Sequence, residues 1–168
     1  ENQYPGIVFY SDIFQLTPST TRWVKRLASY GFVVAAPEIY YRIEPAGTVL
    51  EFDDEGKTRG QADVDALTAA QFDEDITGTL EWLGGYSRVT SGPLGVAGHC
   101  TGGHIGFRAA LSPAVAATAL WYPTGLQNGK LGADADAGSL DRASAISGEL
   151  LMIFGARDPH TSAAERAV

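Results

Sequence analysis

Five short apolar segments, separated by stretches with helical periodicity, constrain the fold of this chain most strongly. Each is a nearly continuous run of β-branched, aromatic and aliphatic residues, which is typical of a strand buried on both faces. Strands that alternate with helices form a parallel sheet covered on both sides. The sequence therefore predicts an α/β fold, a three-layer sandwich with a mostly parallel sheet and helices on both faces. The strands are expected at 6–13, 32–41, 93–100, 114–123 and 149–158.

Helices and two long loops are expected between these strands. In the first helix Thr17 has the side chain of an N-cap, Pro18 stands at the first helical position, and Gly31 is a natural C-terminal stop. The polar segment 42–65 is expected to be a long excursion, which in a compact domain is more often functional than idle. With 168 residues, no internal repeat and no linker, the chain is expected to form one domain over 1–168. Helices are expected at 17–31, 65–86 and 101–112, a loop at 124–148, and the start of a further helix at 162–168.

Composition excludes several classes of partner. The chain has 20 Asp and Glu against 12 Lys and Arg, a formal charge of -8, and no basic cluster. Nucleic acid and anionic membranes are therefore not expected as main partners. The single cysteine cannot form an internal disulfide, which fits a reducing compartment and a cytoplasmic location. No apolar run is long enough to span a bilayer, and a monomer or small homo-oligomer is expected.

The strongest chemical signal is the turn Gly98-x-Cys100-x-Gly102, which lies between an expected strand and an expected helix. This is the context of a nucleophile elbow, with cysteine in place of serine. The nucleophile occupies a strained turn, so its neighbours must be small. A helix N-terminus favours the thiolate, and the backbone N–H of Thr101 would point at a developing oxyanion. The pattern favours a nucleophilic Cys100.

Other interpretations of Cys100 are weaker. A lone cysteine is often a small buried hydrophobe, but the flanking glycines and the strand–helix context favour a nucleophile. One cysteine with scattered histidines lacks the spacing of a zinc site, so no metal is expected. The glycines do not form a phosphate-binding loop, because no lysine follows them.

Asp158 is the expected acidic partner, because it follows the apolar part of the last strand, 149–155, and catalytic groups gather at the carboxyl ends of parallel strands. A turn or N-cap role is the alternative for this residue. No histidine of the chain is a convincing base. His99 is expected to face away from the sulfur, His104 to pack inside the following helix, and His160 lies too close to Asp158 in the chain. The catalytic histidine is therefore expected beyond Val168, in a longer protein.

These residues resemble the dienelactone hydrolase family, cysteine hydrolases of the α/β-hydrolase fold. The resemblance is carried by SDIFQLT, APEIYYR, GHCTGG and FGARD, which occur in the family's order and rough spacing at 11–17, 36–42, 98–103 and 154–158. It covers nearly the whole chain, which is expected to be truncated at both ends relative to the family. The resemblance implies a Cys-His-Asp triad that opens lactone or ester bonds without a cofactor.

The resemblance also implies roles for individual residues. Cys100 corresponds to the nucleophile and Asp158 to the triad acid, while the backbone of Ile13 and Thr101 would form the oxyanion hole. Asp12 takes the place of a family glutamate that contacts the resting thiol. The remaining correspondence is Arg59, which lies near the family's clamp for a substrate carboxylate, although a solvated arginine is an equal alternative.

Three functions remain open from the sequence. The favoured one is a cysteine hydrolase of the dienelactone hydrolase type that acts on a small lactone or ester. The second is a general carboxylesterase or thioesterase on the same scaffold, since a fold does not set the substrate. The third is a non-catalytic or redox-sensing relative in which Cys100 is structural.

Overall fold

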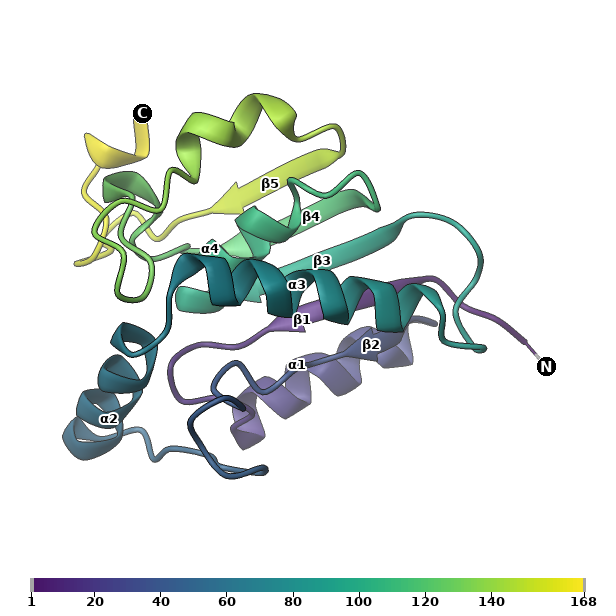
Figure 1. The fold of residues 1–168 in the computed structure, drawn as a ribbon, viewed down its shortest axis with the longest axis horizontal. Helices are drawn as coiled ribbons and strands as arrows, with labels where there is room; N and C mark the ends of the chain where they lie inside the picture. The colour runs from purple at the N-terminus through teal and green to yellow at the C-terminus, as the bar shows by residue number, and fades with distance from the viewer. Residues whose placement is uncertain (1, 168) are drawn as a thin grey trace.

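A parallel sheet of five strands forms the centre of the molecule in a computed structural model that describes residues 2–167 (Figure 1). The strand order is β2-β1-β3-β4-β5, and every pair of neighbours is parallel. The expected α/β architecture is confirmed. The strands are β1 (Gly6–Tyr10), β2 (Val33–Ala35), β3 (Leu94–His99), β4 (Val115–Trp121) and β5 (Glu149–Ile153).

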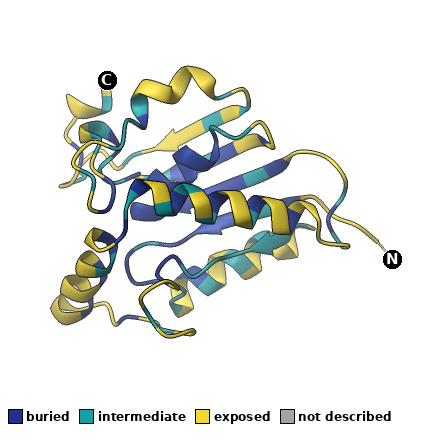
Figure 2. Cartoon of the chain, viewed as in Figure 1, coloured by how far each residue is buried: buried dark blue, intermediate teal, exposed yellow. Residues whose placement is uncertain are grey.

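Helices lie on both faces of this sheet. On one face α3 (Ala69–Gly84) and α4 (Thr101–Ala109) cover β1, β3 and β4 (Figure 1). On the other face lies α1 (Pro18–Ser29), whose Trp23 ring contacts the Trp121 ring of β4 at a centroid distance of 5.6 Å. Buried residues concentrate between the sheet and α3 and α4 (Figure 2), where Val8, Phe72, Val96 and Ile105 share one core cluster.

The apolar segments continue beyond the strands that they form. The first expected strand ends at Tyr10 rather than at residue 13, and the last one ends at Ile153. The largest error concerns 32–41, where only Val33–Ala35 pairs with β1. Pro37 has no N–H to donate to a strand ladder, so the chain leaves the sheet here. Tyr40 is nevertheless fully buried, because the following turn folds back onto the core.

The polar excursion at 42–65 contains a helix that was not expected. The helix α2 (Asp54–Asp65) is capped by Asp53, whose carboxylate accepts a 2.8 Å hydrogen bond from the Gly56 N–H. Its only buried residues are Gly56, Gly60 and Val64, so it has no apolar stripe to detect. The expected helix at 65–86 begins instead at Ala69.

Thr68 and Gln71 fix the start of α3 through a reciprocal capping box, with the Gln71 side chain accepting from the Thr68 N–H at 2.9 Å. Two further expectations are wrong in detail. The loop at 124–148 contains the short 3-10 helices Leu126–Asn128 and Leu140–Ala145, and the expected terminal helix is a 3-10 turn at Glu165–Ala167. Residue 168 lies outside the described residues.

Candidate active site

Cys100 stands alone between β3 and α4, as the elbow pattern predicts. Its backbone has φ +56° and ψ −127°, a region that is costly for any residue other than glycine. Backbone hydrogen bonds on both sides of the residue hold this conformation. The Cys100 N–H donates to the Trp121 carbonyl at 3.0 Å, and the Cys100 carbonyl accepts from Gly103 at 2.9 Å and from Thr124 at 3.0 Å. Strain at a nucleophile that its surroundings enforce is typical of a functional turn.

Close backbone approach explains the glycines beside Cys100. A Cβ atom on Gly98 would overlap the Gly102 carbonyl, and one on Gly102 would overlap the carbonyls of Tyr10 and Ser11. On Gly103 the added atom would lie 2.8 Å from the Pro123 Cα. The glycines therefore let α4 begin directly against the ends of β1 and β4, which raises Cys100 at the carboxyl edge of the sheet.

A pocket of about 500 Å³ opens at Cys100. Five of the six residues singled out in the sequence line it, brought together from the ends of β1, β3 and β5. Part of its wall comes from α2, the helix that the sequence did not reveal. The lining residues are Asp12, Ile13, Phe14, Phe52, Asp53, Asp54, Lys57, Gln61, Cys100, Thr101, Tyr122, Thr124, Asp158 and His160.

Arg59 is the exception among the expected site residues. It belongs to α2 but is not among the residues that line the Cys100 pocket. Its guanidinium forms two hydrogen bonds with the Glu44 carboxylate, at 2.9 and 2.6 Å. This contact lowers the pKa of Glu44 and raises the pKa of Arg59. Binding of a substrate carboxylate by Arg59 stays a prediction.

The two expected oxyanion donors lie at the pocket in suitable surroundings. Thr101 is the first residue of α4, so its N–H has no carbonyl one turn earlier within the helix. Ile13 lies in the turn after β1, where the neighbouring N–H groups of Phe14 and Gln15 both bond to Asp12. Neither amide has an acceptor within residues 2–167, so both are available to a ligand oxygen.

Asp12 is engaged with groups other than the thiol. One carboxylate oxygen accepts a 2.9 Å hydrogen bond from the Phe14 N–H, and the other lies 3.0 Å from His99 Nε2. His99 therefore turns toward Asp12, and its ring also contacts those of Phe9 and Tyr122. The thiol contact that the resemblance implies for Asp12 stays a prediction.

Tyr122 and Thr124 are functional candidates that the sequence reasoning missed. Tyr122 lines the pocket with Cys100, Asp12 and Asp158, and its pKa is raised by partial burial and then by these three groups. Thr124 places its hydroxyl 3.5 Å from Cys100 Sγ. Both residues follow the carboxyl end of β4, which ends at Trp121. The strand was expected to continue to residue 123, so only Thr124 could have been identified by its position after a parallel strand.

Asp158 lies on the loop after β5. One of its carboxylate oxygens accepts a 2.8 Å hydrogen bond from the His160 backbone N–H, which closes a short turn. The His160 carbonyl in turn accepts from the Gln127 side chain at 3.1 Å. The loop thus brings the carboxylate of Asp158 and the exposed His160 to the pocket edge.

His104 is fully buried beneath this site, as expected for a packing residue. Its Nδ1 faces the Thr124 carbonyl at 3.3 Å, and its Nε2 lies 2.7 Å from Ser139 Oγ. A carbonyl only accepts, so Nδ1 carries the hydrogen and Nε2 accepts from Ser139. Arg108 donates to the same Ser139 oxygen at 2.8 Å and pairs with Asp73. Burial lowers the pKa of His104 to about 4, so the ring is neutral near pH 7.

Acid should destabilise the protein through His104. An unfolded chain binds a proton at this histidine near pH 6.5, whereas the folded chain does so only near pH 4. The free energy of unfolding therefore has its full value above pH 6.5. It falls by about 3 kcal/mol as the pH falls toward 4. Urea denaturation across this range should show a steeper loss for the wild type than for His104→Gln. Parallel curves for the two proteins would contradict the buried neutral ring.

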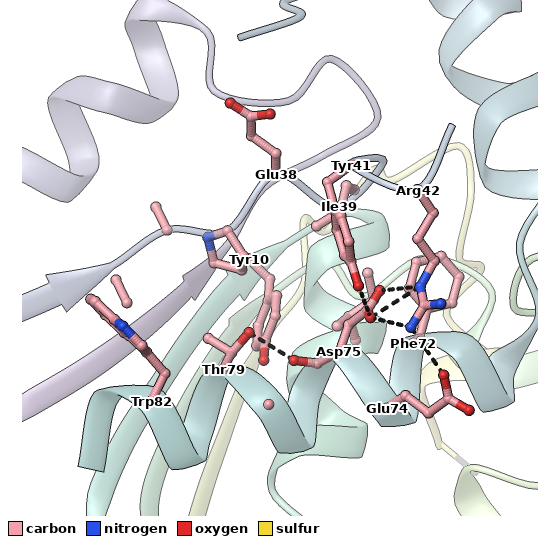
Figure 3. A pocket seen from close by; sticks show the side chains of 15 residues that line it. Tyr10, Glu38, Ile39, Tyr41, Arg42, Phe72, Glu74, Asp75, Thr79 and Trp82 are labelled. Atoms are coloured by element: carbon pink, nitrogen blue, oxygen red, sulfur yellow. Dashed lines mark hydrogen bonds and ion pairs between the residues drawn. The ribbon is translucent and has the colours of Figure 1, made fainter. Parts of the chain in front are cut away.

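A second pocket of similar size, about 500 Å³, lies between α3 and the turn after β2. Figure 3 shows Tyr41 and Arg42 converging on Asp75, with hydrogen bonds of 2.8 Å and 2.6 Å. The Tyr10 side chain lies in this pocket, and burial raises its pKa. No Cys, Ser or His lines this pocket, so it offers no nucleophile with an adjacent base.

Two features are absent from the part of the chain that the structure describes. Within residues 2–167 no three His, Cys, Asp or Glu side chains come together in a way that could hold a metal ion. In the same range no helix has the length and apolar character needed to cross a bilayer.

Comparison with known proteins identifies a hydrolase family, in agreement with the geometry of the elbow. The model of the dienelactone hydrolase family matches residues 1–167. A "Putative carboxymethylenebutenolidase" of Saccharomyces cerevisiae is 32% identical over 161 residues, covering 94% of this chain and 59% of that protein. A Synechocystis protein of the same description is 29% identical over 156 residues, covering 93% of this chain and 62% of that protein. The chain thus spans about 60% of the length of these relatives.

Solved structures show the same fold. A "Putative Dienelactone Hydrolase" of Klebsiella pneumoniae superposes with a TM-score of 0.76 at 21% identity, covering 99% of this chain and 67% of that one. The metagenomic protein P91, described as a dienelactone hydrolase-like promiscuous phosphotriesterase, gives a TM-score of 0.73 at 21% identity, with coverages of 99% and 63%.

Proposed function

The chain belongs to the dienelactone hydrolase family, and on this premise we propose that its full-length protein is a cysteine hydrolase that opens a lactone or small carboxylic ester at Cys100. One observation supports this most strongly. Cys100 holds a left-handed backbone conformation at the start of α4 and shares a pocket with Asp158 and with the amides of Ile13 and Thr101. A nucleophile, an acid and oxyanion donors in one pocket are the parts that acyl transfer needs.

In the proposed reaction the Cys100 thiolate attacks the carbonyl carbon of the substrate. The Ile13 and Thr101 amides stabilise the resulting oxyanion, a contribution of roughly 2.7–4 kcal/mol per donor in comparable sites. Collapse of this intermediate expels the alcohol and leaves an acyl group on the sulfur. Water then attacks the acyl group, releases the carboxylic acid and regenerates the thiol.

A base must remove the thiol proton and later activate the water. We place it on a histidine outside these 168 residues, oriented by Asp158, because the three histidines of the chain have other positions. The His99 ring is bound to Asp12, and the His104 ring is buried between Ser139 and Thr124. His160 is anchored through its backbone to the same Asp158 that would have to orient its ring.

The charge of the pocket favours an uncharged ester over an anionic one. Four aspartates line the pocket with one lysine, Lys57. Arg59, the residue implied to bind a carboxylate, is occupied by Glu44. These observations support a second candidate on the same scaffold, a general carboxylesterase for uncharged esters.

A pair of chromogenic esters tests this proposal in the full-length protein. We expect turnover of p-nitrophenyl acetate with a kcat/KM at least about tenfold higher than for the p-nitrophenyl hemiester of succinic acid. The hemiester carries a free carboxylate, which the aspartates of the pocket repel. Treatment with iodoacetamide should abolish both activities. Turnover that survives complete alkylation of Cys100 would overturn the proposal, and a preference for the anionic ester would overturn the substrate class alone.

A further inference from the structure

Thr124 is tied to Cys100 at two points. Its backbone N–H donates to the Cys100 carbonyl at 3.0 Å, which holds the loop after β4 against the elbow. Its hydroxyl lies 3.5 Å from Cys100 Sγ and 3.3 Å from the Tyr122 carbonyl oxygen. A threonine hydroxyl has one hydrogen to donate, so it can satisfy only one of these two acceptors at a time.

The two acceptors differ in strength according to the state of the sulfur. A neutral thiol is a weak acceptor, and the Tyr122 carbonyl then competes well for the hydrogen. A thiolate carries a full charge, and hydrogen bonds to charged groups are stronger than those between neutral groups. Loss of the thiol proton should therefore turn the Thr124 hydrogen from the carbonyl to the sulfur.

We propose that Thr124 is a catalytic residue of this site, whose hydroxyl donates to the Cys100 thiolate and stabilises it before it attacks. The inference rests on the proposed function, because it gives the thiolate a role. It extends that function by a donor to the sulfur itself, separate from the two amides that face the substrate oxygen.

The surroundings of the sulfur explain why such a donor matters. Aspartate carboxylates from several elements line the pocket, and their negative charge disfavours a thiolate at Cys100. On the favourable side stand the N-terminus of α4, a single lysine, and the Thr124 hydroxyl. The titratable groups around the pocket are Asp12 after β1, Tyr40 after β2, Asp53, Asp54 and Lys57 at α2, Tyr122 after β4, and Asp158 and His160 after β5.

The position of Thr124 does not depend on its own side chain. Its carbonyl accepts from the buried His104, and its N–H is bound to Cys100. Both are backbone groups and remain in a Thr124→Val variant, which has nearly the same shape but lacks the hydroxyl. Valine therefore removes the donor to the sulfur without removing the contacts that hold the loop.

The test is the thiol pKa of Cys100 in the full-length protein, taken from the rate of iodoacetamide alkylation against pH. We expect Thr124→Val to raise it by about one pH unit, the size expected when one hydrogen bond to a partly exposed anion is lost. Thr124→Ser keeps a hydroxyl and should stay near the wild-type value. Thr118→Val is the matched control, since Thr118 is a buried β4 residue whose hydroxyl has no partner within the described residues.

An unchanged pKa in Thr124→Val would overturn the proposal, and so would a serine variant that shifts as far as valine. If circular dichroism shows that the valine variant is unfolded, Thr124→Ala replaces it with the same expected shift. Alkylation requires no turnover, so the two proposals fail separately. If the wild-type protein hydrolyses no ester but Thr124→Val shifts the thiol pKa, the role of Thr124 as a donor stands and the proposed hydrolase activity is overturned. If the wild type is active but Thr124→Val leaves the thiol pKa unchanged, the hydrolase proposal stands and the role of Thr124 is overturned.

Discussion

Cys100→Ala in the full-length protein should lower kcat/KM for p-nitrophenyl acetate by about 10³-fold or more. The substitution removes the atom that forms the acyl intermediate, and loss of the nucleophile in comparable triads costs at least this much. The amides of Ile13 and Thr101 would remain, so any residual rate would come from oxyanion stabilisation and binding alone. Initial rates at matched protein concentration measure the effect.

Cys100→Ser provides the control for folding, because it replaces sulfur by oxygen in the same strained turn. It should retain the thermal unfolding midpoint of the wild type and still lose most of the activity, since a serine hydroxyl is far less acidic than a thiol. A Cys100→Ala protein with wild-type turnover would show that the chemistry lies elsewhere and would favour the structural or redox interpretation of Cys100.

The elbow could be predicted from the sequence because its residues form one short motif. Gly98, Gly102 and Gly103 all lie within a few residues of Cys100, although the backbone that Gly102 and Gly103 approach belongs to the ends of β1 and β4. The same kind of local signal identified the cap at Thr17, whose hydroxyl accepts from Thr20 at 3.2 Å. A motif that spans only a few residues can be recognised in the sequence before the fold is known.

Errors arose where distant contacts decide the structure. The helix α2 buries glycines against the turns at Ile13 and Glu51 rather than an apolar stripe, so hydrophobic periodicity could not reveal it. Arg59 pairs with Glu44, fifteen residues earlier in the chain. Neither contact leaves a periodic trace, and both required the fold to be known.

The candidate site was predicted in part for the same reason. Cys100 and Asp158 follow from motif and strand order, and their shared pocket is a consequence of parallel strands ending at one edge. Tyr122 and Thr124 sit on that edge without a motif of their own. Position after a parallel strand points to Thr124, whereas Tyr122 lay inside the strand expected at 114–123 and is revealed only by the earlier end of β4 at Trp121.

Gly102→Ala should destabilise the full-length protein by about 3 kcal/mol or more, measured by urea denaturation. The added methyl group meets the carbonyl oxygens of Tyr10 and Ser11, which are backbone atoms at the end of β1 and cannot rotate away. The strain can be relieved only if α4 moves off the sheet, and overpacking of this kind is among the costlier single substitutions.

The matched control is Gly78→Ala, in an exposed position of α3 where an added Cβ meets nothing within 4 Å. That change should be neutral or stabilising by up to about 1 kcal/mol, because alanine is the better helix former. Equal stabilities for the two variants would mean that α4 does not approach β1 as closely as the elbow requires. The glycine at 102 would then need an explanation other than the raised cysteine, and the geometric argument for a nucleophile at Cys100 would lose its main support.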